Sequence, residues 1–373
     1  MTARSEIPDT PFAVVDVAAL ERNIDAMHQH LAARSVGVRP HTKTSKCIEI
    51  VTRQVEAGAI GLTVATLGEA EALVSHGFWS IFHGYPVWAG TPARARRIRS
   101  LHEECEYLVG VESPEAASAL ADAVRGSRSP LRVLVEVDCG MRRSGVQPDE
   151  IATLARRCGD LGLDVRGAFT FGGHAYSSCD APVRAGDDEI SALAAADDAL
   201  RSIGLEPAIL SAGSTPTARH SARPPVTDER PGTYIFLDRQ QAALGAGDIG
   251  NTSLVVVTTV VASHADGRFV LDAGSKILST DRPQWLEGFG HLPAYPDAVV
   301  ARLSEHHAVC TTEGPRPRVG DVLALVPNHC CVVVNLVDEL HALASLDTQG
   351  NLLDPGLWAG AEQWRVVSRG ANT

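Results

Sequence analysis

Short apolar runs and amphipathic helical patterns alternate along the first two thirds of the chain. Leu20, Ile24, Met27 and Leu31 recur at helical spacing, which predicts one apolar helix face over residues 17–33. Runs rich in β-branched residues predict strands at 36–40, 62–66, 80–86, 106–111, 131–137, 164–171, 207–213 and 233–238. Eight strands that alternate with helices are typical of a parallel (β/α)8 barrel of the TIM type.

Beyond residue 245 the pattern changes to strands without long helices between them. Leu254–Ser263 and Arg268–Asp272 flank His264-Ala265-Asp266-Gly267, which is a hairpin signal. Further strands are predicted at 319–326 and 331–337. We therefore predict a barrel over residues 17–245 and a second, mostly antiparallel β domain over 246–373. Residues 1–16, with a short strand at 12–16, are assigned to that second domain.

The composition is that of an ordinary globular protein and excludes several functional classes. The 373 residues carry a formal net charge of −12 without a basic stretch, so nucleic acid and anionic membrane are not expected as partners. The apolar runs are far shorter than the roughly 18 residues that suggest a membrane span. The N-terminal MTARSEIPDT has no apolar export signal, and the eight cysteines show no disulfide spacing. We expect a cytoplasmic enzyme with a small-molecule substrate.

In a barrel of this type, chemistry takes place on the loops that follow the C-terminal ends of the strands. Polar residues gather at residues 39–46, 138–145, 172–176 and 211–215, and at Arg230 just before the eighth predicted strand. The chain has only three lysines, Lys43, Lys46 and Lys276. Because Lys43 follows the first strand, it is the amine most directly placed for chemistry.

Two of these loops indicate a phosphorylated aldehyde as cofactor. The turn at Ser211–Thr215 is small, hydroxylated and glycine-containing, so its backbone N–H groups can approach a phosphate closely. A desolvated lysine can form a Schiff base with an aldehyde. Together with an arginine for the ring heteroatoms, these features describe a site for pyridoxal 5'-phosphate. Taken alone, each has a simpler interpretation, as an ordinary turn and a surface lysine.

A different kind of site is indicated in the second domain by Pro327-Asn328-His329-Cys330-Cys331. In an extended segment, residues two apart share a face, so His329 and Cys331 would point one way and Cys330 the other. Imidazole and thiolate ligands suit Zn2+, and a site with only two protein ligands keeps positions open for water or substrate. The alternative is a buried cysteine pair at the start of a strand.

Taken in order, several sequence blocks resemble the D-serine dehydratase / D-threonine aldolase family of pyridoxal-phosphate enzymes, which have an alanine-racemase-type barrel (fold type III). The resemblance covers nearly the whole chain. It is carried by Thr10-Pro11, Arg39-Pro40-His41-Thr42-Lys43-Thr44, Gly140-Met141-Arg142-Arg143-Ser144-Gly145, Gly213-Ser214-Thr215-Pro216-Thr217, Arg230-Pro231-Gly232-Thr233-Tyr234, Asp272-Ala273-Gly274-Ser275-Lys276 and Pro327-Asn328-His329-x-Cys331.

The resemblance implies roles for individual residues. Lys43 is implied as the catalytic residue that binds the cofactor, with His174 stacked on the cofactor ring. Arg143 and Arg230 are implied at the ring oxygen and nitrogen. The complete set of expected cofactor-binding residues is Lys43, His41, Arg143, His174, Tyr176, Gly213, Ser214, Thr215, Arg230 and Tyr234. The resemblance also implies a homodimer, in which the second domain of one chain closes over the barrel of the other.

The resemblance further implies that His329 and Cys331 bind a divalent metal, Zn2+ or another such as Mn2+. Cys331 in place of the aspartate found in other members favours the zinc-dependent dehydratase branch. This chain departs from the family pattern at Ser45, where a histidine is usual two residues after the cofactor lysine. The departure affects the expected substrate contacts and leaves the cofactor assignment in place.

The expected constellation supports more than one reaction on a D-configured β-hydroxy amino acid. If the metal makes the β-hydroxyl a leaving group, elimination gives a keto acid and ammonia, which is the outcome we predict from Cys331. If a base removes the hydroxyl proton, the Cα–Cβ bond breaks and the products are glycine and an aldehyde. An amino-acid racemase is a further alternative, in which the metal pair would have no role. A non-catalytic pyridoxal-phosphate-binding regulator is the alternative from another class, although such proteins lack the second β domain.

Overall fold

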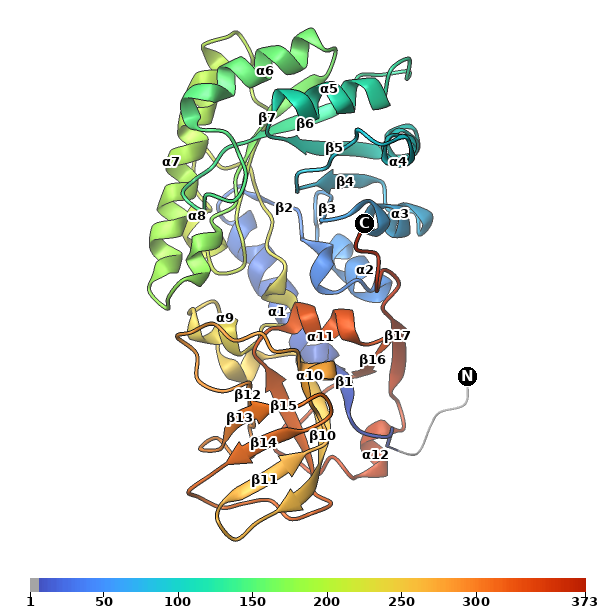
Figure 1. Ribbon diagram of the computed structural model, residues 1–373, viewed down its shortest axis with the longest axis vertical. Coiled ribbons are helices and arrows are strands. Elements are labelled where there is room, and N and C mark those ends of the chain that lie inside the picture. Colours follow the sequence, from blue (N-terminus) through green and yellow to red (C-terminus); the bar gives the residue numbers. More distant parts are fainter. Residues whose placement is uncertain (1–6) are drawn as a thin grey trace. The chain divides into compact units, whose positions relative to one another are not determined.

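The computed structural model describes residues 7–373, which form two compact units (Figure 1). The first unit contains the chain up to Ala26, Thr44–Ile50 and Thr233–Arg369. The second contains Met27–Lys43, Val51–Gly232 and Gly370–Thr373. Residues 1–6 lie outside the described part. They include most of the stretch on which we based the expectation of no export signal, and the start of the predicted 1–16 segment.

The second unit is built on eight parallel strands in the order β2-β9-β8-β7-β6-β5-β4-β3. A parallel bridge between His41 and Thr63 and a 2.9 Å hydrogen bond from the Ile60 N–H to the Val38 carbonyl connect the first strand to β3. The eight parallel strands are therefore connected all the way round, and the predicted barrel is confirmed. The strands are β2 (Gly37–Val38), β3 (Leu62–Val64), β4 (Ser80–His83), β5 (Glu106–Val111), β6 (Arg132–Glu136), β7 (Asp164–Phe169), β8 (Ile209–Ala212) and β9 (Asp228–Glu229).

Helices connect successive strands and follow one another around the outside of the sheet (Figure 1). Several of these helices begin at a capping side chain: Thr66, Thr91 and Ser113 each accept a hydrogen bond from a first-turn N–H. The helices are α2 (Ile48–Glu56), α3 (Leu67–Ser75), α4 (Pro92–Glu104), α5 (Pro114–Ala123), α6 (Ile151–Asp160), α7 (Ala181–Arg201) and α8 (Ala218–Ser221); α1 (Val17–Ala32) starts in the first unit and ends in the second.

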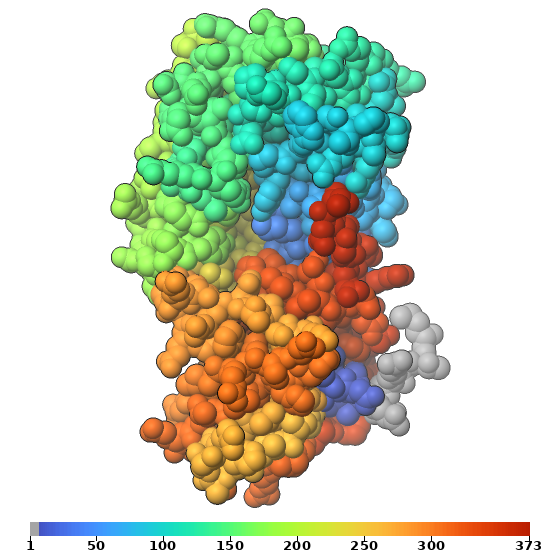
Figure 2. Space-filling view, in the orientation of Figure 1, coloured from blue at the N-terminus to red at the C-terminus, as the bar shows by residue number. Residues whose placement is uncertain are grey.

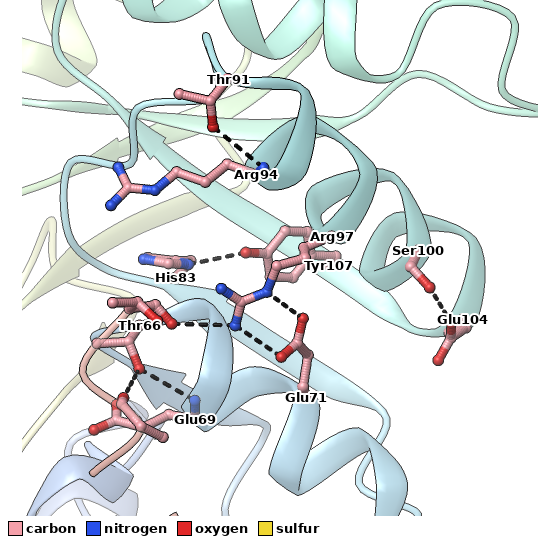
Figure 3. A network of polar contacts seen from close by, with 12 residues as sticks. Thr66, Glu69, Glu71, His83, Thr91, Arg94, Arg97, Ser100, Glu104 and Tyr107 are labelled. Carbon is pink, nitrogen blue, oxygen red and sulfur yellow. Dashed lines mark hydrogen bonds and ion pairs between the residues drawn. The ribbon is translucent and has the colours of Figure 1, made fainter.

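Polar contacts join α3, α4 and the last residues of the chain. Arg97 of α4 donates to both carboxylate oxygens of Glu71 on α3, at 2.6 and 2.8 Å (Figure 3). The same guanidinium donates to the Thr373 carbonyl at 3.1 Å, and the Gly68 N–H donates to that oxygen at 3.0 Å. Figure 2 shows these last residues, in dark red, against the blue and cyan surface of the helices. Residues 370–373 therefore belong to the barrel unit.

Large apolar side chains from four consecutive strands, β4 to β7, pack together inside the barrel unit. Phe82, Leu108, Leu134 and Phe169 form one buried cluster. The rings of Phe82 and Phe169 meet edge to face at 5.1 Å between centroids. The barrel is therefore a packed core, and its polar groups lie at the loop end.

The first unit is a mixed, mostly antiparallel sheet. β1 (Phe12–Asp16) pairs antiparallel with β10 (Leu254–Ser263) and parallel with β16 (Glu339–Leu343), so the early strand belongs to this sheet. The predicted hairpin is confirmed, because β10 pairs antiparallel with β11 (Arg268–Leu271). The remaining elements are β12 (Gly290–His291), β13 (Val299–Leu303), β14 (Ala308–Thr311), β15 (Val322–Pro327), β17 (Glu362–Arg365), α9 (Arg239–Ala243), α10 (Ser275–Leu278), α11 (Cys330–Leu336) and α12 (Pro355–Trp358).

The predicted eighth barrel strand at 233–238 is wrong. That segment forms a 3-10 turn over Thr233–Ile235, and Asp238 then caps α9 by accepting the Gln241 N–H at 2.7 Å. The eighth strand is instead the acidic pair Asp228–Glu229, which pairs with β8 and β2. A hydrophobic pattern does not predict a buried strand at two consecutive acidic residues, whereas it does predict one at Tyr234-Ile235-Phe236-Leu237. As a consequence, Arg230 follows the eighth strand and does not precede it.

The predicted strand at 331–337 is also wrong, because Cys330–Leu336 is the helix α11. The run Val332-Val333-Val334 has high β propensity, but Asp238 Oδ2 accepts the Cys330 N–H at 3.0 Å and so satisfies a donor at the helix start. A carboxylate from a residue far away in the sequence thus caps this helix. The extended geometry that we assumed for residues 329–331 therefore applies only to His329, which has β-region dihedrals.

Candidate active site

Lys43 lies in a short 3-10 turn, Thr42–Thr44, immediately after the first barrel strand. Its Nζ donates a 2.7 Å hydrogen bond to Tyr85 Oη, in the loop that follows β4. The Tyr85 ring also lies under the ammonium group, 5.1 Å from the centroid. Arg143, from the loop after β6, stacks on the same ring at 5.1 Å. Tyr85 therefore links the predicted lysine and arginine.

His41 lies beside this group as a neutral imidazole. Its ring meets the Tyr85 ring edge to face at 5.7 Å. Burial lowers the pKa of His41 well below its usual value, and the positive charges of Lys43, Arg230 and Arg143 lower it further. Neither ring nitrogen has a hydrogen-bond partner among residues 7–373. His41 can therefore accept or donate one hydrogen bond to a bound molecule without carrying charge.

His174 is oriented by a carboxylate on the next helix. It lies in the 3-10 turn Gly173–Tyr176, and its Nε2 is 3.0 Å from Asp188 Oδ2 of α7. A side chain at Gly140 would meet the His174 ring at 3.7 Å, so the ring faces the backbone of the loop after β6. Tyr176 ends the same turn and is half-buried.

The phosphate turn predicted at Ser211–Thr215 starts inside β8, and the turn itself, residues 213–217, follows that strand and is buried throughout. Gly213 has a φ of 95°, a left-handed conformation that glycine adopts without steric cost. The Ser214 N–H and hydroxyl both bond Thr217 Oγ1, at 2.9 Å each. The Thr217 and Ala218 N–H groups return to the Ser214 carbonyl and start α8. The turn is thus preformed, with two hydroxyl groups and backbone amides gathered at one point.

Arg230 is buried at the same end of the barrel. Its guanidinium donates to Ser211 Oγ at 2.5 Å and to the Thr170 carbonyl, and it lies over the rings of Phe82 and Phe169. Burial opposes its charge and lowers its pKa, while neighbouring acidic groups, first among them Asp228, offset that effect. The arginine is therefore a fixed positive charge among loops of the barrel.

The predicted metal pair lies in the other unit. His329 precedes α11 and Cys331 belongs to its first turn, and their side chains are hydrogen-bonded to one another. His329 Nδ1 is 3.6 Å from Asp238 Oδ2. Burial by itself lowers the pKa of His329, but Cys331, Asp238 and Asp281 together raise it to about 9. Negative groups therefore surround the imidazole.

Cys330 differs from its neighbour Cys331 in burial. Its side chain is fully buried, and burial raises the pKa of its thiol well above the usual value, with Cys331 and Asp238 adding to the effect. Cys331 is half-buried, with Sγ 3.3 Å from Thr44 Oγ1. Among residues 7–373, no three His, Cys, Asp or Glu side chains are grouped as a complete metal cage. A metal here would have two protein ligands.

The structure thus brings together most of the predicted cofactor residues, in one unit. Tyr234 is buried within the 3-10 turn Thr233–Ile235 of the first unit, and its part in cofactor binding stays a prediction. Sequence reasoning missed Tyr85, although the rule that barrel loops carry chemistry points to it. The strand predicted at 80–86 was three residues too long and placed Tyr85 inside the sheet. Asp188, Asp238 and two buried glutamates gave no signal, because their partners are distant in sequence.

The chain combines an eight-stranded parallel barrel with a second β unit. A lysine follows the first barrel strand and a glycine turn follows the seventh. This combination defines a class of pyridoxal-phosphate enzymes, those with the alanine-racemase-type barrel. Residues 15–240 match the family model described as alanine racemase, N-terminal domain, and residues 253–343 match the putative serine dehydratase domain. The chain belongs to the D-serine dehydratase / D-threonine aldolase family of pyridoxal-phosphate-dependent lyases.

Three relatives show the range of this family. The chain is 31% identical over 361 residues to the D-threo-3-hydroxyaspartate dehydratase of Delftia sp. (strain HT23), covering 90% of this chain and 94% of that protein. The solved structure of that dehydratase superposes with a TM-score of 0.86 at 28% identity, covering 98% of this chain and 99% of the other. The D-threonine aldolase of Arthrobacter sp. is 31% identical over 342 residues, with 89% and 88% covered. The D-serine dehydratase of Dictyostelium discoideum is 25% identical over 375 residues, with 90% and 93% covered.

Within residues 7–373, every helix is too short or too polar to cross a membrane.

Proposed function

We propose that this protein is a pyridoxal-phosphate- and divalent-metal-dependent dehydratase, which eliminates water from a D-configured β-hydroxy amino acid to give a keto acid and ammonia. The observation that carries the proposal is the pair of His329 and Cys331 side chains at the start of α11, next to Asp238. The similarity to a dehydratase at 31% identity over nearly its whole length supports the same reaction.

The barrel residues fit the cofactor. Lys43 supplies an amine at the end of the first strand, and His41 supplies two buried ring nitrogens that lack partners among the described residues. The turn at 213–217 gathers backbone amides and hydroxyls where a phosphate needs donors, and Arg230 is a fixed cation nearby. Pyridoxal phosphate, when bound, supplies an electron sink that makes the Cα proton of an amino acid removable.

Lys43 is the residue that would transfer this Cα proton. Its Nζ is the group that would hold the cofactor aldehyde, and as a free amine it would take up the Cα proton of the substrate. Tyr85 Oη accepts a hydrogen bond from this amine at 2.7 Å and so fixes its direction. Arg143 stacks over the Tyr85 ring and holds that ring in place. Tyr85 therefore orients the base.

His329 and Cys331 are the residues that would hold a divalent metal. Asp238 near His329 Nδ1 matches the carboxylate–histidine arrangement that orients metal-ligating imidazoles. A divalent ion in such a site supplies Lewis-acid activation of a hydroxyl leaving group. One solved structure of a D-threo-3-hydroxyaspartate dehydratase is a variant in the metal-free form, which supports metal binding in this family. Thiolate and imidazole ligands favour Zn2+.

Product analysis tests the proposal. The purified protein is incubated with D-serine, with D-threonine and with D-threo-3-hydroxyaspartate, in each case with pyridoxal phosphate and Zn2+. Keto acid and ammonia in equal amounts are the expected products. Glycine and an aldehyde would establish the aldolase reaction instead, which the similarity to the Arthrobacter aldolase makes the second candidate. The L-enantiomer alone, without metal dependence, would establish a racemase.

We also propose a homodimer in the cytoplasm. The eight cysteines lie within the described residues, where all are free thiols, which suits a reducing compartment. The dimer is carried over from the family resemblance. Light scattering of the purified protein should give twice the chain mass of 39.5 kDa, and a value equal to that mass would contradict the dimer.

A further inference from the structure

Two glutamates that the proposed chemistry does not use are buried against the turn at 213–217. Glu189 lies in the middle of α7, and Glu229 is the last residue of β9. Both side chains are 0% exposed. Buried carboxyl groups are costly unless they are paired or hydrogen-bonded, so their place next to a functional loop requires an explanation.

Glu189 joins two loops of the barrel. Its Oε1 accepts the Gly172 N–H at 2.7 Å and the Gly213 N–H at 3.3 Å. Gly172 lies in the loop after β7, and Gly213 starts the turn after β8. One carboxylate oxygen therefore fixes the loop of His174 and the turn at 213–217 to the same helix.

Glu229 lies against the other side of Gly213. A Cβ atom added at Gly213 would overlap Glu229 Oε2, so this carboxyl group occupies the space that a side chain there would fill. Ser221 Oγ lies 2.7 Å from Glu229 Oε1, within hydrogen-bond distance. The two carboxyl groups thus meet at one glycine backbone.

The contacts assign one proton to this pair. Neither Glu189 Oε2 nor Glu229 Oε2 has a hydrogen-bond partner among residues 7–373, so the donors present do not satisfy two buried negative charges. Ser221 Oγ is also 3.0 Å from the Thr217 carbonyl, yet a hydroxyl has a single proton to donate. A proton on Glu229 allows both contacts of Ser221 to be hydrogen bonds. Glu189, which accepts two backbone N–H groups, is the ionised member.

We propose that Glu229 is a neutral carboxylic acid next to ionised Glu189, and that this carboxyl pair positions the turn at 213–217 for the cofactor phosphate. The inference rests on the proposed function, because the phosphate gives the turn its purpose. The pair then carries one negative charge, on Glu189, and so repels the dianionic phosphate less than two ionised carboxylates would.

The electrostatics agree with this assignment. Burial raises the pKa of Glu229 well above its usual value, and the neighbouring charge of Glu189 raises it further. Burial also raises the pKa of Glu189, whereas its hydrogen bonds lower it. The charged groups that face the pair are Asp228, which belongs to β9, and Arg230, which follows it. Glu136 of β6 in turn interacts with Arg230.

Infrared spectroscopy of the full chain tests the proton directly. A buried carboxylic acid has a carbonyl stretch separate from that of carboxylates and amides. Wild type should show this band at neutral pH, and Glu229→Gln should lack it. Glu69→Gln is the matched control, because Glu69 is a buried glutamate whose side chain accepts the Ala65 N–H at 2.8 Å. Its own backbone N–H donates to Thr66, the residue that caps α3 (Figure 3). This control should retain the band.

Cofactor titration tests the positioning role, with pyridoxal as the ligand that lacks a phosphate. Glu229→Gln keeps a neutral side chain of the same size, so it should bind pyridoxal phosphate as wild type does. Glu229→Asp has a shorter side chain, which withdraws the carboxyl group from Ser221. The loss of this hydrogen bond should lower the affinity for pyridoxal phosphate about ten-fold. The affinity for pyridoxal should not change. As pH rises, wild type should lose its preference for the phosphorylated ligand, and Glu229→Gln should keep it.

The outcomes separate this inference from the proposed function. Absence of the acid band from wild type would overturn the proton assignment. Equal weakening by Glu229→Gln and Glu229→Asp, or equal effects on both ligands, would overturn the positioning role. If wild type binds no pyridoxal phosphate while the band is present, the proposed function fails together with the positioning role, and the proton assignment stands.

Discussion

Lys43 differs from the two other lysines in what holds its amine. Lys43 Nζ bonds the phenol of Tyr85, whereas Lys46 Nζ donates to Asn335 Oδ1 at 2.8 Å and Lys276 forms an exposed ion pair with Glu305. We predict that borohydride reduction followed by peptide mapping places the pyridoxyl group on Lys43. Lys43→Ala should abolish the absorbance of the lysine-bound cofactor, and Lys46→Ala should retain it. A label on Lys46 would refute the assignment.

Tyr85 carries the second prediction at this scale. Tyr85→Phe keeps the ring that stacks on Arg143 and removes the hydroxyl that accepts from Lys43. Loss of a hydrogen bond to a charged group predicts a fall in kcat of roughly ten-fold or more with little change in KM. Steady-state kinetics on the substrate found by product analysis provide the measurement. Tyr295→Phe, in the other unit, is the control, and equal kinetics for Tyr85→Phe and wild type would exclude Tyr85 from the reaction.

At the scale of elements, the start of α11 decides which cysteine can bind metal. Cys331 is half-buried beside His329, while Cys330 is fully buried with its N–H bonded to Asp238. Cys331→Ala should therefore lose bound metal and lyase activity but keep the absorbance of the lysine-bound cofactor. Cys330→Ala should keep metal and cost about 1 kcal/mol of stability, as point mutants typically do.

Metal content measured by mass spectrometry distinguishes the two variants. Chelator should inactivate wild type, and added Zn2+ should restore it, since an ion with two protein ligands exchanges readily. Loss of metal from Cys330→Ala with full metal in Cys331→Ala would show that the ligand assignment is wrong. The prediction does not depend on the extended geometry first assumed, because the structure places the His329 and Cys331 side chains together at a helix start.

At the scale of the whole molecule, buried histidines make stability depend on pH. His83, at the end of β4, bonds Tyr107 Oη at 2.9 Å, and burial lowers its pKa to about 4 from a usual value of 6.5. The unfolded chain therefore binds a proton between these two pH values that the folded chain does not, so stability is lost as the pH falls below 6.5. Between pH 7 and 5 this loss is about 2 kcal/mol.

Urea unfolding at both pH values provides the measurement. His83→Asn retains a side chain able to bond Tyr107 and cannot titrate, so its free energy of unfolding should fall by about 2 kcal/mol less than that of wild type. An equal fall in both proteins would show that His83 does not remain neutral in the folded barrel.

The sequence by itself determined the class of fold and the positions of most chemical groups. Periodicity identified seven of the eight barrel strands, the strand 12–16 and the hairpin after residue 254, because these elements bury apolar side chains at regular spacing. Motif order indicated Lys43, the turn at 213–217, Arg230 and the His329–Cys331 pair as candidate site residues. Such features are local, since a few neighbouring residues carry them.

Tertiary structure alone decided whatever depends on a partner distant in the chain. Asp238 caps α11 and turns a valine-rich run into a helix, and Glu229 ends a strand that no hydrophobic pattern marks. Tyr85, Glu189 and Asp188 meet their partners only because the barrel brings successive loops to one end. Hydrogen bonds and buried charges act over a few ångströms in space, so they override local propensity wherever the fold makes distant residues neighbours.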